Sequence, residues 1–167
     1  MHMNRPPTSG PSSIAFLLTQ IGAHSASRFA ERLTSLDLLP HHAGVLRMLG
    51  QSEGISQQEL AARLQMHASR LVGVVDTLEK RGLVARESSA TDRRVYALQL
   101  TEAGRHTLKQ LGAIAREHDS AVCDGLSAQE RTQLFHLLQR IAERQGLART
   151  VHPGYRTLGE REDSQPQ

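Results

Sequence analysis

The sequence is poor in aromatic residues, in cysteine and in long apolar runs. Phe, Trp and Tyr make up 3% of the 167 residues, with no Trp, which argues against a module that stacks bases on an aromatic platform. The single Cys cannot form an internal disulfide, so we expect a reducing, cytoplasmic location. The best apolar run, Ile14–Leu18, is much shorter than the roughly 18 residues that cross a membrane and shorter than a secretory h-region of roughly 7–15 residues. We therefore expect neither membrane insertion nor export.

The chain also lacks the signatures of common enzymes and metal sites. It contains no Gly-rich phosphate loop, no nucleophile elbow and no organised Ser, His and Asp set, so we expect no enzyme, no catalytic residue and no cofactor. The histidines, among them His41 and His42, show no HExxH or similar ligand spacing, which favours surface or satisfied histidines over a metal-dependent sensor. Cys123 is expected to be a buried structural thiol.

Positive charge is concentrated in one stretch of the chain. The formal net charge is +3, from 20 Lys and Arg against 17 Asp and Glu. Between Arg63 and Arg94 there are seven basic and four acidic residues, so the rest of the chain holds thirteen of each sign. A local excess of this kind suits a polyanionic partner. A solvated helix face with mixed charges explains it equally well, so charge alone does not decide.

Apolar residues recur mostly at helical spacing. Residues 1–13 contain three prolines and no apolar period, and are predicted to form a loose arm. From Ile14 to Leu36 the apolar residues follow a helical period, and another helix follows Pro40. No proline occurs between Pro40 and Pro153, which permits a mostly helical body.

Two short helices and a hairpin are predicted in the middle of the chain. The segment Ser56-Gln57-Gln58-Glu59 is a capping box that opens the first helix. After a break near Gln65–Met66, a second helix carries an apolar face and ends at Gly82. Alternating residues in 83–87 and 95–100 then flank a polar segment, which predicts a β-hairpin with a charged tip.

Two more helices are predicted after the hairpin, capped by Thr101 and by a second capping box that begins at Ser127. The resulting order predicts a mostly α fold with a small β-hairpin wing, that is, a winged helix-turn-helix plus a helical region.

Three motifs carry a family resemblance. They are Leu78-Glu79-Lys80-Arg81-Gly82-Leu83-Val84, Asp92-Arg93-Arg94 and Leu100-Thr101-Glu102-Ala103-Gly104. Together they resemble the MarR family of bacterial transcriptional regulators, and the similarity in element order extends from about Ile14 to Gly146.

The resemblance implies a homodimer with one winged helix-turn-helix lobe in each subunit. The expected divisions are a flexible arm (1–13), an N-terminal dimerisation helix (14–38), the DNA-binding lobe (40–100), C-terminal dimerisation helices (101–146) and a tail (147–167). Apolar stripes on the first and the last two helices agree with a shared helical core. An intramolecular bundle is the alternative.

At the wing, Asp92 and Arg94 match the family's Asp-x-Arg pattern. The resemblance implies that the carboxylate steadies the arginine, which enters the minor groove. A guanidinium on a narrow hairpin suits the negative potential there. The alternative is a solvated turn with a weak ion pair. Arg93 is expected to contact a phosphate.

In the second helix of the helix-turn-helix, Arg70 is the best candidate for reading a base, because arginine binds the O6 and N7 atoms of guanine. A phosphate contact is nearly as good an interpretation. His67 and Ser69 are candidates for base or phosphate contacts. Many family members carry a longer polar or basic side chain where Gly73 stands, which puts base contacts from that turn in doubt.

Further phosphate contacts are expected from the start of the preceding helix and from the strand that enters the wing. The helix offers backbone N–H groups at Ser56, Gln57 and Gln58. Ser56 is also explained by capping alone, and Gln57 and Gln58 remain undecided. Arg86, which leads into the wing, is a further phosphate candidate.

The predicted function is a dimeric, sequence-specific regulator of transcription that binds double-stranded DNA at a pseudo-palindromic operator. The resemblance also implies repression relieved by a small aromatic or phenolic effector, with His24, His42, Arg47 and His106 as candidate polar groups near it. A winged-helix module that binds protein and never DNA is the alternative.

Overall fold

The computed structural model describes residues 13–88, 96–148 and 151–152. The chain forms α1 (Ile14–Leu33), a short 3-10 helix η1 (Thr34–Leu36), α2 (Pro40–Gln51), β1 (Ile55–Ser56), α3 (Gln57–Leu64), α4 (Ala68–Lys80), β2 (Val84–Ser88), β3 (Tyr96–Leu100), α5 (Glu102–Val122) and α6 (Ala128–Arg144). The predicted fold class, mostly α with a small hairpin, is confirmed.

The strands form one small antiparallel sheet in the order β1-β3-β2. The hairpin pairs Val84 with Leu100 and Ser88 with Tyr96. The two-residue strand β1 was not predicted, because two residues are too few to show an alternating pattern. It pairs Ile55 with Leu98 and thereby ties the start of α3 to the hairpin.

The predicted helix boundaries agree with the local chemistry of the chain. α3 ends at Gln65, whose φ is +52°, and the chain leaves α4 at Gly82, whose φ is +68°. Gly tolerates this left-handed conformation at no steric cost, so the break after α4 is built into the sequence. Thr101 Oγ1 accepts a hydrogen bond from Gly104 N at 3.0 Å and caps α5. Ser127 and Glu130 form the complete capping box of α6.

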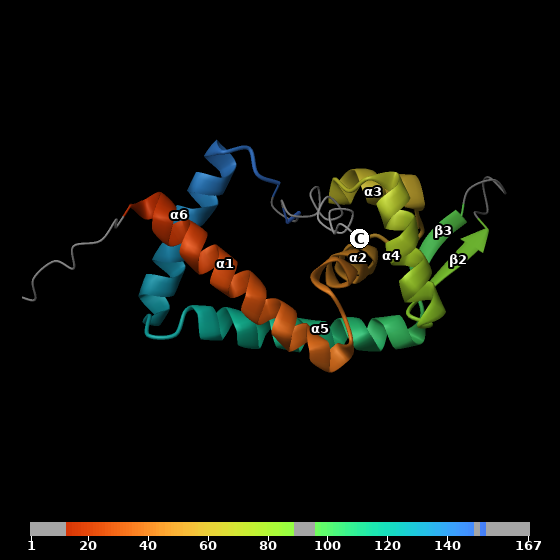
Figure 1. Cartoon of the computed structure of the whole chain (residues 1–167), viewed down its shortest axis with the longest axis horizontal. Helices are drawn as coiled ribbons and strands as arrows, with labels where there is room; N and C mark the ends of the chain where they lie inside the picture. The colour runs from red at the N-terminus through yellow and green to blue at the C-terminus, as the bar shows by residue number, and fades with distance from the viewer. Residues whose placement is uncertain (1–12, 89–95, 149–150, 153–167) are drawn as a thin grey trace, which may run out of the picture.

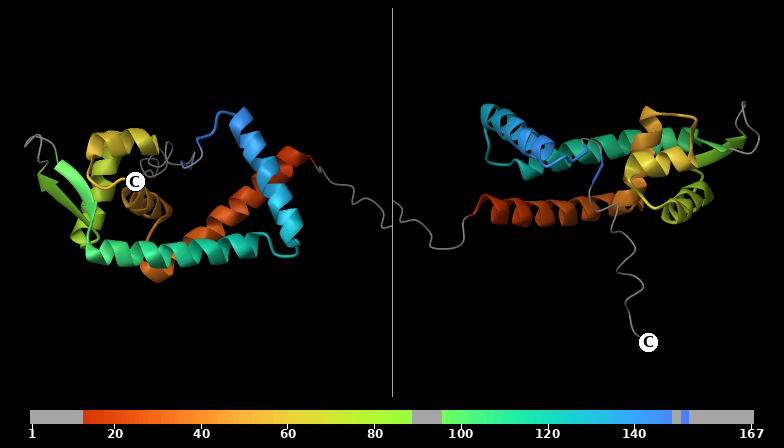
Figure 2. Two further views of the ribbon diagram at one scale, coloured as in Figure 1. Left: turned by 180° about the vertical axis from the view of Figure 1, so that it is seen from behind. Right: turned by 90° about the horizontal axis from the view of Figure 1, so that it is seen from above.

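The core lies in one lobe of the molecule. α2, α3, α4 and the sheet supply nearly all of the buried apolar side chains, with Leu33 from the end of α1 and Leu111 from α5. Figure 1 shows α5 running from beneath this lobe to α6. The helix α1 crosses α5 and contacts it. The view from above in Figure 2 shows the lobe at one end of α5 and α6 at the other.

The helices away from the lobe leave their apolar side chains uncovered. Leu33 is the only buried residue of α1, and no residue of α6 is buried. Large exposed side chains include Ile14, Phe16, Leu17, Leu18 and Ile21 on α1, and Leu134, Phe135, Leu137, Leu138 and Ile141 on α6. Within residues 13–88 and 96–148, a single copy therefore does not form the intramolecular bundle that the sequence left open.

None of the helices in the described part of the chain combines the length and the apolar character needed to span a bilayer.

Candidate nucleic-acid interface

The helix α4 turns one apolar face into the lobe and a polar face outward. Leu71, Val74, Val75 and Leu78 are buried, at the i, i+3, i+4, i+7 spacing expected of a helix packed on a core. Ser69, Gly73 and Thr77 are exposed and follow one another at four-residue steps. A Cβ added at Gly73 would meet nothing within 4 Å. The outward face therefore has small side chains, and none at Gly73, so another surface can approach the helix backbone closely there.

The start of α3 is partly as predicted. Ser56 Oγ accepts a hydrogen bond from Glu59 N at 3.1 Å. The expected return contact from Glu59 does not form, because its carboxylate accepts from Arg63 Nη2 at 2.5 Å. Gln58 is exposed and Gln57 is half-buried. Ser56 thus acts as a cap, and the helix start remains accessible at Gln58.

Arg86 donates three side-chain hydrogen bonds within the lobe. Its Nη2 donates to Asp76 Oδ1 at 2.5 Å and to Gln57 Oε1 at 3.3 Å, and its Nη1 donates to Glu79. Although desolvation opposes it, the hydrogen bond that Arg86 donates to Asp76 and the negative charge of Glu79 raise the pKa of Arg86. The phosphate contact expected from the sequence stays a prediction, and the structure shows a further role for this side chain. Arg86 ties α3, α4 and β2 together and neutralises two carboxylates that would otherwise repel an anionic partner.

Arg70 lies in the first turn of α4 and is half-buried. Its Nε is buried and has no hydrogen-bond partner among the described residues. His67 and Ser69, which flank the same turn, are exposed. The three residues expected at the start of this helix are thus brought together at one accessible end.

Ion pairs neutralise much of the positive charge in the basic stretch between Arg63 and Arg94. Among the described cations of the basic stretch, Arg63 pairs with Glu59, Arg81 with Asp37, and Arg86 with Asp76 and Glu79. Arg70 and Lys80 form no ion pair with any described residue. Within the described part of the basic stretch, the cations without an ion pair therefore lie on α4.

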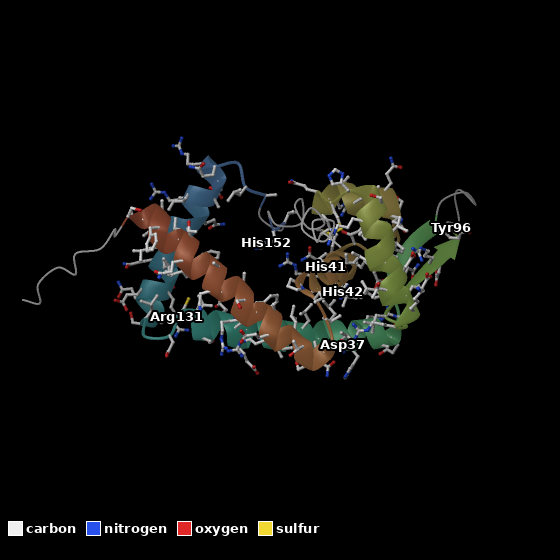
Figure 3. All side chains as sticks on the ribbon, in the orientation of Figure 1. Asp37, His41, His42, Tyr96, Arg131 and His152 are labelled. Carbon is white, nitrogen blue, oxygen red and sulfur yellow. The ribbon has the colours of Figure 1, made fainter. Side chains whose placement is uncertain are left out.

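The hairpin strands extend from the lobe at the end opposite α6 (Figure 1). Tyr96 lies on the same side of the sheet as the buried Leu98 and Leu100, yet it is 56% exposed because the hairpin reaches beyond the core. Figure 3 shows Tyr96 at the outer end of the strand. Asp92, Arg93 and Arg94, expected at the wing tip, lie outside the described residues.

The four candidate effector residues do not gather in one place. His24 lines a cavity between α1 and α5, and the other three do not line it. Arg47 and His106 are exposed on α2 and α5. His42 is 7% exposed, and its Nδ1 accepts a hydrogen bond from Leu39 N at 3.1 Å. His42 therefore caps the start of α2 (Figure 3), and the ligand contact expected from the sequence stays a prediction.

The buried state of His42 predicts a pH-dependent stability. Burial, assisted by the positive charges of His41 and Arg81, lowers the pKa of His42 from 6.5 to about 4. The unfolded chain therefore takes up this proton more readily than the folded one. The free energy of unfolding is expected to be unaffected above pH 6.5 and to fall by up to about 3 kcal/mol as the pH drops from about 6.5 to 4.

Urea denaturation at a series of pH values measures this change. The His42→Gln variant should lose most of the slope between these two pH values, whereas His106→Gln, at an exposed position on α5, should keep it. An unchanged slope in His42→Gln would contradict the assignment.

Two further expectations from the sequence concern metal ions and the single cysteine. The described residues contain no group of three or more His, Cys, Asp or Glu side chains arranged to hold a metal ion. Cys123 is a free, half-buried thiol at the C-cap of α5. The expectation of a buried thiol was wrong, because this end of α5 lies outside the lobe core.

Three residues that the structure places on the outward surface or in a cavity were not among the site candidates from the sequence. Val72 is 39% exposed on α4 and Tyr96 is exposed on β3. The position of Val72 outside the apolar stripe is a signal that would have identified it. His118 lines the cavity between α1 and α5, and no sequence signal singled it out.

Comparisons with known proteins agree with this geometry. The family model described as MarR family matches residues 36–95. The chain is 34% identical over 115 residues to a transcriptional regulatory protein for the hcr operon of Thauera aromatica, covering 68% of this chain and 69% of that protein. It is 30% identical over 128 residues to the HTH-type transcriptional repressor Rv2887 of Mycobacterium tuberculosis, covering 77% of this chain and 92% of that protein.

Solved structures are similar over most of the chain. The repressor CouR bound to a 23-mer DNA duplex has a TM-score of 0.69 and 30% identity, covering 78% of this chain and 92% of that one. Rv2887 in complex with DNA has a TM-score of 0.68 and 28% identity, covering 78% and 98%. Rv2887 in complex with p-aminosalicylic acid has a TM-score of 0.64 and 29% identity, covering 78% and 99%. The helix-turn-helix lobe, its hairpin and these similarities together show that the chain belongs to the MarR family of transcriptional regulators.

Proposed function

We propose that this protein is a homodimeric repressor that binds double-stranded DNA at a pseudo-palindromic operator in the cytoplasm and has no enzymatic activity. The observation that carries the proposal is the exposed, low face of α4 beside the hairpin, on a lobe whose apolar side chains are buried. A helix presented in this way fits the major groove, and a hairpin at its side reaches the adjoining minor groove.

Dimerisation is supported by the uncovered apolar side chains of α1 and α6. A second copy that packs on these helices removes them from water and sets two lobes side by side. Twofold symmetry then places the two α4 helices in major grooves about one helical turn, ~10 base pairs, apart.

The placement of the side chains supports the following proposed roles. Arg70, with Ser69 and His67, is proposed to contact bases or phosphates at the start of α4. Val72 offers an exposed apolar contact to a thymine methyl group. Ser56, Gln57 and Gln58 are proposed to hold a phosphate at the start of α3, and Tyr96 extends the surface toward the wing.

A small aromatic or phenolic ligand is proposed to weaken DNA binding. Support comes from Rv2887, for which structures with DNA and with p-aminosalicylic acid are both known. A ligand that prefers a lobe spacing unsuited to the operator shifts the population of the dimer away from the DNA-binding form.

The test of DNA binding is an anisotropy titration with a selected duplex at several salt concentrations. The proposal expects log affinity to fall linearly with log salt, because phosphate contacts release counterions. Absent or salt-independent binding would favour a winged-helix module that binds protein.

For the wing, we predict that Arg94→Ala weakens operator binding by at least about tenfold, because a guanidinium in a narrow minor groove is lost. Arg116→Ala removes the same charge from the exposed surface of α5 and should change the affinity by less than about twofold. Anisotropy measures both, and wild-type affinity in Arg94→Ala would contradict the role.

For α4, we predict that Arg70→Ala relaxes base preference at one symmetric pair of operator positions, by about 1–3 kcal/mol of discrimination. Selection from a random DNA pool, followed by affinity measurements on single-base variants, checks this. Lys80→Ala, at the other end of the same helix, should leave the preference intact. If Arg70→Ala weakens all sequences equally, Arg70 is a phosphate contact.

A further inference from the structure

The chain between α1 and α2 joins the lobe to the first helix. It consists of η1 and residues 37–39. Asp37 has a φ of +52°, so the chain turns sharply at this residue. Leu33 and Leu38, on either side of the turn, are buried. On its C-terminal side the lobe continues into α5, which is one unbroken helix. The turn at Asp37 is therefore a non-helical joint between the lobe and α1, and Figure 3 shows Asp37 at the end of α1 that adjoins the lobe.

Arg81 contacts this joint from the end of α4. Its Nη2 donates to the carbonyl oxygen of Leu36 at 2.9 Å, and its Nη1 donates to the carbonyl oxygen of Asp37. Arg81 is the C-cap residue of α4 and lies 44 residues from Asp37 in the chain. One guanidinium thereby connects the last turn of α4 to the turn that follows α1.

The two carbonyl hydrogen bonds, more than charge, hold this contact. The Asp37 carboxylate lies 3.7 Å from Arg81 Nη2, which is beyond hydrogen-bond distance, and its side chain is 95% exposed. An ion pair exposed to this degree contributes little. Arg81 itself is half-buried, and the backbone that accepts its hydrogen bonds is held by the bond from Asp37 N to Thr34 O at 3.0 Å. A planar guanidinium that binds two fixed acceptors has a defined orientation, which an ammonium group does not provide.

We propose that Arg81 is a positioning residue for DNA recognition, because it fixes the angle between α4 and α1 and thereby the separation of the two α4 helices in the dimer. The inference rests on the proposed function, in which α1 contributes to the dimer and α4 contacts DNA. A rotation at the joint moves α4 relative to the twofold axis and leaves the lobe core intact. The separation of the two α4 helices must match the spacing of the operator half-sites. Loss of the Arg81 contacts should therefore alter the preferred spacing and spare the binding of a single half-site.

A test without DNA measures the distance between the two α4 helices. In a Cys123→Ser background, Ser69→Cys places one spin label on the exposed start of α4 in each subunit. Double electron–electron resonance then gives the distance distribution. Arg81→Gln should widen this distribution at least about 1.5-fold. Arg63→Gln is an equal charge change at a residue whose hydrogen bonds lie within the lobe, and it should leave the distribution unchanged. An unchanged distribution in dimeric Arg81→Gln would overturn the proposal.

A test with DNA compares duplexes that differ only in the spacing of their half-sites. They carry two half-sites at the selected spacing, two half-sites with one base pair inserted or removed, or one half-site alone. Anisotropy gives the Kd for each duplex. Wild-type protein should prefer the selected spacing at least about tenfold, since one base pair rotates a half-site by about 35°.

In Arg81→Gln this preference should fall below about threefold, while the Kd for a single half-site changes less than about twofold. Arg63→Gln should keep the wild-type preference. An equal loss of affinity for every duplex, the single half-site included, would make Arg81 a phosphate contact and overturn the positioning role.

Two further variants separate hydrogen bonding from charge. Arg81→Lys keeps the charge and loses the planar fork, so it should behave like Arg81→Gln in both tests. Asp37→Asn removes the carboxylate, keeps both carbonyl acceptors and tolerates a positive φ, so it should behave like the wild type. Circular dichroism verifies that each variant is folded. Wild-type behaviour of Arg81→Lys, or a loss of spacing preference in Asp37→Asn, would assign the effect to charge and contradict the proposal.

The two proposals fail separately. A wild-type dimer that selects no duplex would overturn the proposed DNA binding, whereas the distance measurement would still test the contact of Arg81. A DNA-binding dimer whose distances and spacing preference do not respond to Arg81→Gln and Arg81→Lys would overturn this inference alone. A monomeric wild-type protein would overturn both.

Discussion

Replacing Leu137 with Glu is expected to convert the dimer to a monomer and to lower affinity for a two-half-site operator by at least about 100-fold. Leu137 is 54% exposed in the single chain and shares one face of α6 with Leu134, Leu138 and Ile141. In a twofold interface the substitution introduces two glutamates that face the same apolar contact, and burying unpaired carboxylates is costly. A monomer engages one half-site and loses the gain from linked binding.

Sedimentation equilibrium and anisotropy measure the two effects. Thr132→Glu adds the same charge to an exposed polar position on the opposite side of α6 and should leave both the dimer and its affinity unchanged. Affinity for a single half-site should be nearly equal in Leu137→Glu and wild-type protein. A dimeric Leu137→Glu variant, or a monomeric wild-type protein at micromolar concentration, would show that α6 does not form the interface.

Replacing Gly104 with Ala is expected to destabilise the fold by about 2–4 kcal/mol. A Cβ at Gly104 would lie 2.0 Å from the carbonyl oxygen of Leu83 and 3.0 Å from its carbonyl carbon. That oxygen also accepts the hydrogen bond of Thr101 N at 3.1 Å, so the strand cannot retreat without losing it. Since backbone atoms are involved, no side-chain rotation relieves the clash.

The matched control is Gly112→Ala in the same helix. A Cβ there meets only Arg116 Nη1, at 3.5 Å, which is an ordinary contact. This variant should gain about 0.5–1 kcal/mol, since Ala is the better helix former. Urea denaturation of both variants gives the comparison. Equal stabilities would mean that the turn between the hairpin and α5 shifts at little energetic cost.

The resemblance motifs have physical explanations in the structure. Gly82 is needed where the chain leaves α4 with positive φ, Thr101 caps α5, and Gly104 lets α5 start against the Leu83 carbonyl. These residues hold the hairpin beside α4. The family motif therefore specifies the geometry of the lobe in addition to any contact with DNA.

The sequence by itself determined the order of the six α-helices and the hairpin, the breaks at Gln65 and Gly82 and the caps at Thr101 and Ser127. Each of these depends on residues within about one helical turn, where periodicity and capping act. The sequence also identified the apolar faces of α1 and α6. An apolar stripe has the same helical period whether or not it is buried within a single chain.

Only the tertiary structure decided how distant side chains combine. Arg86 forms ion pairs with Asp76 and Glu79 because the hairpin places it beside α4. The side chains of His118 and Ser25, which are 93 residues apart in the chain, form a hydrogen bond. His42 became a buried helix contact, and Cys123 remained outside the core. Such pairings depend on how helices pack, which composition and local spacing do not encode, so charge and residue type alone do not predict them.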